Sequence, residues 1–237
     1  MNSSFYPAIF ERKSIRKYDE TPLTGDQLAL VKTEMEAATP LLPGEKFKLE
    51  LNPAKEGWRI YGYCENTSLG NVNLGYVLQQ LDLALHVAGF GRLWYGFGRA
   101  PRDVKAPKGL SYAMCLKIGV SAEPLTRELS EFDRQASIVH GENKNLAELL
   151  EPARLAPSAM NSQPWLFSGD ASTIHVWRKQ LGIKKLFLGR MNLIDVGISL
   201  CHAILAIEHA NKAFTVEVNT PAQSIADYDY LLTLRIN

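Results

Sequence analysis

The sequence predicts an α+β fold made of two internally repeated halves, in which antiparallel or mixed sheets are flanked by helices. Three observations support this prediction. The order helix, strand pair, long helix, strand, strand occurs twice along the 237 residues. A shift of 122 residues places Gly75 on Gly197 and Ala88 on Ala210, and a shift of 118 places Leu28 on Leu146. A hydrophobic content of 46% is enough to form a buried core.

In the first half, the pattern of apolar residues predicts two helices and four strands. Apolar residues recur at helical spacing over 26–38 and, more strongly, over 71–88. Gly89 follows the longer helix and ends it. Strand-like runs occupy 47–51, 58–64, 93–97 and 112–120.

The second half repeats this order after a charged segment at 127–145. We therefore predict two consecutive halves, 1–126, which carries the basic segment, and 127–237, which carries the polar loop. Helical spacing predicts one helix at 146–155 and a long one at 192–211. Strands are expected at 165–168, 173–177, 214–218 and 230–236.

Composition excludes several classes of protein. The net charge of +1 argues against a nucleic-acid or polyanion partner. The three cysteines are widely spaced, and neither they nor the five histidines form a metal, redox or triad motif. No apolar signal region precedes Glu11, and Asp195 and Glu208 interrupt the apolar helix at 192–211. We therefore expect a soluble, cytoplasmic protein with no membrane and no metal.

The first candidate functional segment is a stiff, polar loop at 156–165, between a predicted helix and a predicted strand. Its prolines fix φ and remove backbone donors. Ser158, Asn161 and Gln163 place donors and acceptors at short range, and Trp165 adds a flat apolar body. Such a loop can hold a planar, hydrogen-bonding ligand. The alternative is an ordinary turn against which a tryptophan packs.

The second candidate segment is basic and lies near the start of the chain, Glu11-Arg12-Lys13-Ser14-Ile15-Arg16-Lys17-Tyr18. In an extended run, Arg12, Ser14 and Arg16 project to one face while Lys13 points elsewhere. Guanidinium groups bind phosphate through paired hydrogen bonds. The alternative is a solvated basic turn.

Both segments resemble motifs of the nitroreductase family of FMN-dependent oxidoreductases. The basic segment is similar to the family's Arg-Arg-Ser-Ile-Arg-Lys-Tyr opening, and the loop to its Pro-Ser-x-x-Asn-x-Gln-Pro-Trp motif. The resemblance implies a nitroreductase-like fold, in which FMN lies at a homodimer interface between the basic motif of one chain and the loop of the other. In the family the two motifs are about one helix apart, whereas here most of the first half separates them.

The internal repeat explains this separation if the chain is a fused pseudo-dimer. At the mirror positions, the basic motif is replaced by Gln135, Ala136 and Ile138, and the loop by residues 39–44. One composite site is then retained and its mirror image is lost. We expect one FMN per chain and a monomer. The alternative is a weak homodimer that pairs through an exposed strand or helix.

The resemblance also implies roles for single residues. Arg12, Lys13, Ser14 and Arg16 are expected to contact the phosphate, with Arg16 reaching the pyrimidine edge of the flavin. Pro157, Ser158, Asn161 and Gln163 are expected to contact the flavin ring, while Trp165 is assigned to the core.

A third segment, Gly89-Phe90-Gly91-Arg92-Leu93-Trp94-Tyr95-Gly96-Phe97-Gly98, resembles the family's Gly-Leu-Gly-x-x-Trp. The resemblance implies that the backbone of Tyr95 and Gly96 faces flavin N5. The alternative is a helix C-cap followed by a packed strand, and this is expected for Phe90 and Trp94. Arg127 resembles the family's late phosphate-binding residue, with a surface arginine as the alternative.

These expectations indicate an NAD(P)H oxidoreductase that reduces nitroaromatic, quinone or related small acceptors by a ping-pong hydride mechanism. No catalytic side chain is expected, because the cofactor carries the chemistry. A flavin store or sensor without turnover is the main alternative. Dehalogenation, with 180–190 as a lid over the flavin, is a third.

Overall fold

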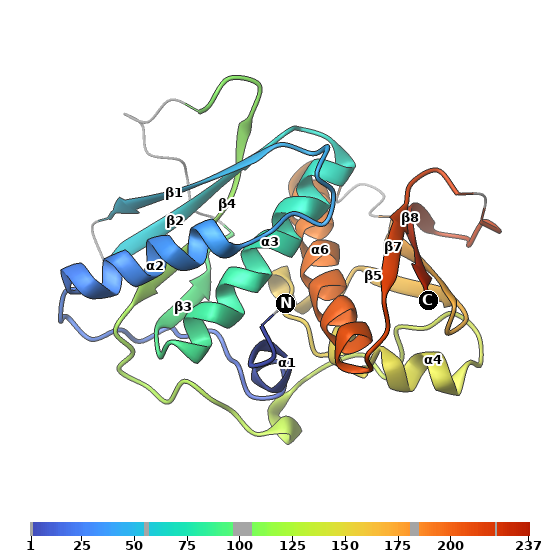
Figure 1. Cartoon of the computed structure of the whole chain (residues 1–237), viewed down its shortest axis with the longest axis horizontal. Helices are drawn as coiled ribbons and strands as arrows, with labels where there is room; N and C mark the ends of the chain where they lie inside the picture. The colour runs from blue at the N-terminus through green and yellow to red at the C-terminus, as the bar shows by residue number, and fades with distance from the viewer. Residues whose placement is uncertain (1, 55–56, 97–105, 181–184, 221) are drawn as a thin grey trace.

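Two four-stranded antiparallel sheets lie on either side of a central pair of long helices in the computed structural model (Figure 1). The structure describes residues 2–54, 57–96, 106–180, 185–220 and 222–237. The strands of the first sheet are, in spatial order, β1 (Phe47–Pro53), β2 (Trp58–Cys64), β4 (Ser111–Gly119) and β3 (Gly91–Trp94). Those of the second are β5 (Trp165–Gly169), β6 (Thr173–Lys179), β8 (Tyr228–Ile236) and β7 (Phe214–Glu217).

The two sheets share strand order and register. A β-bulge interrupts the pairing of β2 with β4 between Gly62 and Tyr63, and one interrupts that of β6 with β8 between Val176 and Trp177. Ile118 pairs with Arg92 on β3, and its counterpart Ile236 pairs with Phe214 on β7. The shift of 118 therefore relates β4 to β8, and the shift of 122 relates β3 to β7, whereas β2 and β6 are related by a shift of 114, from Gly62 to Val176. The predicted α+β fold with two repeated halves is confirmed.

The helices α3 (Ser68–Val87) and α6 (Lys185–His209) cross between the sheets and form the centre of the hydrophobic core. Thr67 caps α3 by accepting a hydrogen bond from Gly70 N–H. The segment Gly189–His209 is apolar enough to cross a membrane, but 89% of its most apolar window is buried inside the protein. It is therefore a core helix. Buried side chains from both halves form one continuous cluster around the pair.

The remaining helices are short and peripheral. They are α1 (Phe5–Ala8), α2 (Gly25–Ala37), η1 (Leu129–Glu131), α4 (Lys144–Leu149), α5 (Glu151–Arg154) and η2 (Ala159–Asn161). A capping box between Thr24 and Gln27 starts α2. The helix predicted at 146–155 is divided into α4 and α5, because Pro152 has no N–H and its ring conflicts with a continuous helix.

Other boundaries also differ from the predictions. The long helix begins at Lys185 rather than at residue 192, so 185–190 belongs to α6 and is not a loop over the site. Arg190 of this turn is anchored on the first half, where it donates to Asn71 Oδ1 and Ser111 Oγ at 2.8 Å each. Residues 181–184 of the expected lid and the predicted strand end at 97 lie outside the described residues.

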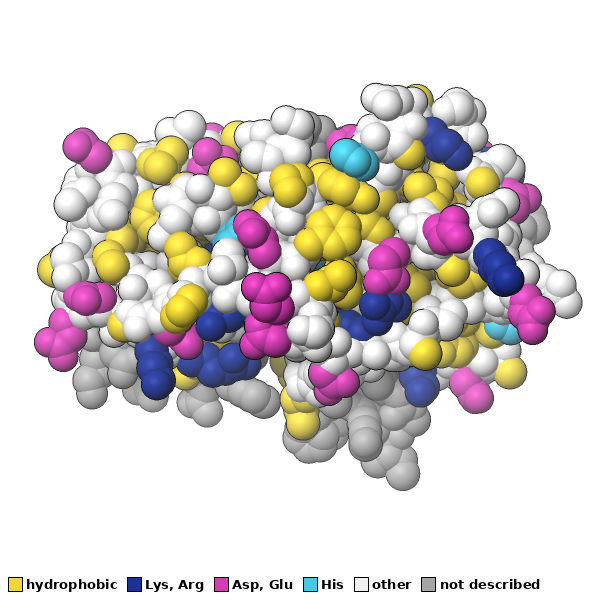
Figure 2. All heavy atoms as spheres, turned by 90° about the horizontal axis from the view of Figure 1, so that it is seen from below, with side chains coloured by type: hydrophobic (Ala, Val, Ile, Leu, Met, Phe, Trp, Pro, Cys, Tyr) yellow, Lys and Arg dark blue, Asp and Glu magenta, His cyan; other side chains and the backbone are white. Residues whose placement is uncertain are grey.

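Charges of both signs are interspersed on the face of the molecule seen from below (Figure 2). Lys and Arg side chains lie there next to Asp and Glu side chains, with hydrophobic side chains between them. All three cysteines, Cys64, Cys115 and Cys201, are buried and free.

Candidate functional site

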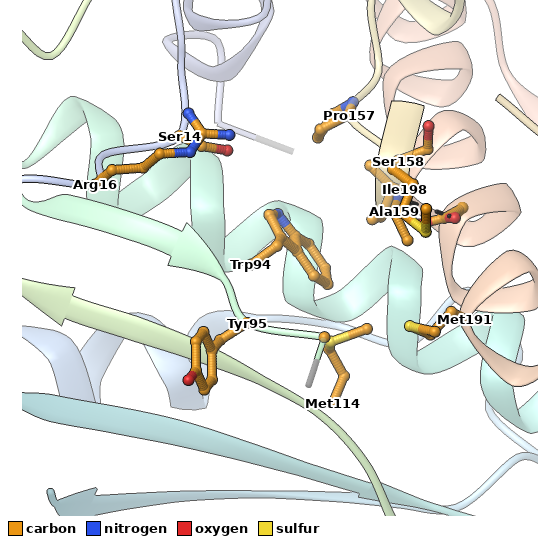
Figure 3. Close-up of a pocket in the computed structure, with 13 residues that line it drawn as sticks. Ser14, Arg16, Trp94, Tyr95, Met114, Pro157, Ser158, Ala159, Met191 and Ile198 are labelled. Carbon is orange, nitrogen blue, oxygen red and sulfur yellow. Dashed lines mark hydrogen bonds between the residues drawn. The ribbon is translucent and has the colours of Figure 1, made fainter. Parts of the chain in front are cut away.

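Two adjoining cavities lie where the first and second halves meet. The smaller has a volume of about 220 Å³ and the larger about 550 Å³. They share five lining residues, Ser14, Arg16, Pro157, Ser158 and Met160. Figure 3 shows Ser14 and Arg16 on one side of the smaller cavity and Pro157 and Ser158 on the other. The basic segment of the first half and the polar loop of the second thus face the same space.

The smaller cavity, here called the apolar cavity, extends toward the helix pair. Trp94 of β3, Met114 of β4, and Met191 and Ile198 of α6 line it. The Nε1–H of Trp94 is buried without a hydrogen-bond partner among the described residues. Because a buried unpaired N–H is costly, a ligand acceptor that reached this donor would be stabilised.

The larger cavity, here called the charged cavity, opens toward the basic segment. Its charged lining residues are Arg12, Lys13, Arg16, Glu123, Arg127, Glu131, Asp133 and Arg134. Burial, reinforced by neighbouring guanidinium groups, lowers the pKa values of Arg127 and Arg134 to about 10. Both guanidinium groups also lie over the Phe132 ring, at 3.4 and 5.6 Å from its centroid. An anion would relieve this crowding of positive charge.

The basic segment is held from below by a buried ion-pair triad. Arg12 Nε lies 3.0 Å from Asp82 Oδ2, and Arg92 Nε lies 3.7 Å from Asp82 Oδ1. All three side chains are at most 1% exposed. Arg92 also donates to the carbonyl of Lys13 at 3.1 Å. Arg12 therefore directs its guanidinium at Asp82 even though it lines the charged cavity.

Glu123 fixes the same segment from the outside. Its carboxylate accepts hydrogen bonds from the backbone N–H groups of Arg16 and Lys17, at 2.6 and 3.0 Å, and these lower its pKa. Lys13 Nζ lies 3.9 Å from it. Lys13 lines the charged cavity together with Arg12, Ser14 and Arg16, so the residue types that strict alternation would separate adjoin one space.

The polar loop is held by α6 beneath it. Asp195 accepts a hydrogen bond from Ala159 N–H, with its two oxygens at 3.1 and 3.2 Å. Burial raises the pKa of this carboxyl to about 8. In the first half the counterpart of Asp195 is Asn73, which accepts from Leu41 N–H at 2.9 Å. Both halves thus tie this loop to the long helix in the same way.

The structure brings most of the predicted site residues together. Arg12, Lys13, Ser14, Arg16, Arg127, Pro157, Ser158 and Asn161 line the charged cavity. Tyr95 and Gly96 line the apolar cavity, although the Tyr95 ring packs on Arg59 at 4.8 Å. Gln163 lines neither, and its side-chain oxygen instead accepts from Gln135 N–H at 2.8 Å. Trp165 is 1% exposed and lies in the core, as expected. The contacts of these residues with a cofactor remain predictions.

Sequence reasoning missed several lining residues. Trp94 was assigned to packing, and Met114, Met191 and Ile198 carry no local signal because distant elements bring them to the cavity. Arg134 and Asp195 could have been found, because the shift of 122 places them on Arg12 and Asn73.

The family model described as "Putative TM nitroreductase" matches residues 4–207. The chain belongs to this nitroreductase family. The predicted family is thereby confirmed, and the match includes both the basic segment and the polar loop. A search of curated proteins gave no match. Among the described residues of this nitroreductase, no group of His, Cys, Asp or Glu could hold a metal ion.

The chain is also similar to solved structures, and the first of these shares its fold. A "putative nitroreductase" from Thermotoga maritima is 21% identical, with a TM-score of 0.70 over 99% of this chain and 94% of that one. A nitroreductase with bound FMN from Desulfitobacterium hafniense is 13% identical, with a TM-score of 0.45 over 61% of this chain and 96% of that one. An FMN-dependent nitroreductase from Clostridium difficile is 17% identical, with a TM-score of 0.44 over 57% and 98%. The first likeness extends over both halves of this nitroreductase.

Proposed function

We propose that this nitroreductase is an FMN-dependent NAD(P)H oxidoreductase that reduces nitroaromatic, quinone or related small acceptors. One observation carries the proposal: the basic segment and the polar loop, from opposite halves of the chain, line the same pair of cavities. These are the two segments whose family counterparts hold FMN between two subunits. The family match over 4–207 supports the coarser assignment to the oxidoreductases.

The residues present fit the chemistry of FMN. The charged cavity offers the Ser14 hydroxyl and the guanidinium groups of Arg16 and Arg127, and Arg127 Nε has no hydrogen-bond partner among the described residues. The apolar cavity is lined by Trp94, whose flat ring carries a buried N–H without a partner among the described residues. A Cβ on Gly96 would lie 3.2 Å from Met191 Sδ, so a glycine lets the backbone approach the cavity closely.

When bound, FMN would accept hydride from NAD(P)H and return electrons to a second molecule. The protein's own side chains would orient the bound molecules and exclude water, and they would not themselves react. Arg16, at the boundary of the two cavities, would place positive charge near the polar edge of the ring. Pro157 and Ser158 would close the opposite side. Because both substrates would occupy the same place in turn, parallel lines are expected in steady-state plots.

The test is spectroscopic. Protein purified from its expression host, or reconstituted with FMN, should absorb near 450 nm with about one FMN per chain. Anaerobic NADH or NADPH should bleach this band within seconds, and a nitroaromatic or quinone should restore it. Flavin that binds but is not reduced would indicate a store or sensor, and a protein that binds no flavin would refute the proposal. A ratio near two would contradict the single composite site.

We also propose that the protein is a cytoplasmic monomer. The crossing of α3 with α6 joins the two repeated halves within one chain, which is where two subunits would otherwise meet. Light scattering coupled to gel filtration should give a mass near 26.4 kDa. A mass near twice that value would show pairing through another surface.

A further inference from the structure

The segment 132–135 is the internal counterpart of residues 10–13, which include the start of the basic segment. Its sequence no longer matches the basic motif, but it contacts the polar loop of its own half at several points. Gln135 N–H donates to Gln163 Oε1 at 2.8 Å, and Asn161 Nδ2 donates to the carbonyl of Asp133 at 3.0 Å. The retained site therefore has a support that the family resemblance did not predict.

Arg134 is the centre of this support. Its Nη1 donates to Asn161 Oδ1 at 2.9 Å and to the carbonyl of Asp133 at 2.7 Å. Its Nη2 donates to the carbonyl of Leu155 at 3.3 Å, before the loop begins. Only Nε has no partner among the described residues. Both N–H groups of Nη1 and one of Nη2 are thus engaged, so the end-on pair of Nη1 and Nη2 is not free for a phosphate.

The loop needs such a support because its backbone is strained. Met160, Asn161 and Gln163 have φ values of 52°, 54° and 45°, in the left-handed region that residues other than glycine rarely adopt. Asparagine tolerates this region better than methionine or glutamine. Strained residues persist only where surrounding contacts over-determine them, and 133–135 provides such contacts at Asn161 and Gln163.

The mirror half lacks this arrangement. Arg12, the counterpart of Arg134, is paired with Asp82 instead. Pro43 stands where a shift of 118 would place Asn161, and it has no side-chain acceptor. The support is therefore confined to the half that retains the loop motif.

We propose that Arg134 is a positioning residue that holds the loop at 157–163 in the conformation that receives the flavin ring, and that it is not a phosphate ligand. This inference rests on the proposed FMN function. It predicts that Arg134 affects flavins with and without a phosphate equally. FMN and riboflavin share the ring and differ in the phosphate, so they separate the two roles.

The first test compares dissociation constants of FMN and riboflavin, measured by flavin fluorescence. Arg134→Ala and Arg134→Lys should weaken both ligands by a similar factor of about fivefold or more, because lysine keeps the charge but cannot bridge Asn161 and Leu155. Arg127→Ala is the matched control, since Arg127 lines the same cavity and should weaken FMN more than riboflavin. A loss confined to FMN, full rescue by lysine, or no loss would overturn the proposal.

The second test needs no flavin. Hydrogen exchange of the unliganded protein should become about tenfold faster at 157–163 in Arg134→Ala, while the mirror loop at 39–44 stays unchanged. Unchanged exchange at 157–163 would overturn the proposal, as would equal acceleration of both loops, which would indicate general destabilisation. If the wild-type protein binds neither flavin, the proposed function fails and this measurement alone decides the role of Arg134.

Discussion

Gly75 and Gly197 lie in equivalent positions at the crossing of α3 with α6, each against the backbone of the other helix. A Cβ on Gly75 would lie 2.1 Å from the carbonyl oxygen of Ile194, and one on Gly197 would lie 2.0 Å from that of Val72. Val72 and Ile194 are themselves related by the shift of 122. The two halves thus meet about an approximate two-fold relationship within one chain.

Alanine at either glycine should destabilise the protein severely. The added methyl group cannot be accommodated unless the helices separate, which would loosen the core between the sheets. We expect Gly75→Ala and Gly197→Ala each to cost about 3 kcal/mol or more of unfolding free energy, measured by urea denaturation. Gly25→Ala is the control, because a Cβ there meets nothing within 4 Å. If Gly197→Ala unfolded at the same urea midpoint as the wild type, the tight helix crossing would be disproved.

Asp195 should make stability depend on pH. Burial raises the pKa of its carboxyl from 3.8 to about 8. Between these values the folded state keeps a proton that the unfolded state releases, so stability falls as pH rises and levels off above about pH 8. Asp195→Asn keeps an acceptor for Ala159 N–H but does not titrate. The variant should lose this slope, of at most about 1.4 kcal/mol per pH unit, in urea unfolding at pH 5.5, 7 and 8.5.

The mirror position supplies the control for Asp195. Asn73 occupies the equivalent place in the first half and also accepts backbone N–H groups of a loop. Asn73→Asp should introduce a pH dependence of the same sign, besides the loss of the bonds that its amide donates. A slope that is identical in wild type and Asp195→Asn would show that another group causes it.

Removing the charge of Asp82 should unfold the region around the basic segment. Asn at this position would leave Arg12 and Arg92 buried without a carboxylate. The expected cost is about 3–5 kcal/mol of unfolding free energy, because the remaining charges are uncompensated. Glu11→Gln, at the half-exposed pair with His86, should cost less than about 1 kcal/mol. Equal costs for the two variants would contradict a buried triad.

Trp94→Phe should affect ligand binding more than folding. It removes a buried N–H that has no partner among the described residues, so the unliganded protein should be as stable as the wild type or more so. If that N–H donates to bound flavin, FMN affinity should fall about fivefold, as measured by fluorescence titration. Trp165 also has a buried N–H for which the described part of the chain supplies no partner, but it lies in the core, so Trp165→Phe should leave FMN affinity unchanged. Unaltered binding by Trp94→Phe would exclude this donor.

The fold could largely be predicted because its signals are local and repeated. Apolar spacing located α3 and β2 to within a few residues. The shift of 118 anticipated the equivalence of β4 with β8, and the shift of 122 that of β3 with β7. The errors came from competing local effects that spacing does not report. Pro152 divides a predicted helix into α4 and α5, and the start of α6 extends over residues whose pattern is not periodic.

The duplicated architecture, the family and the two segments that face each other could be predicted from the amino-acid order, because motif spacing and periodicity are local properties of the chain. The construction of the site depends instead on how distant elements pack. In the folded chain Arg12 pairs with Asp82, and Arg134 donates a hydrogen bond to Asn161. Trp94 and Met191 line one cavity. Which partner a side chain meets depends on distant elements that pack together, and no local pattern encodes that choice.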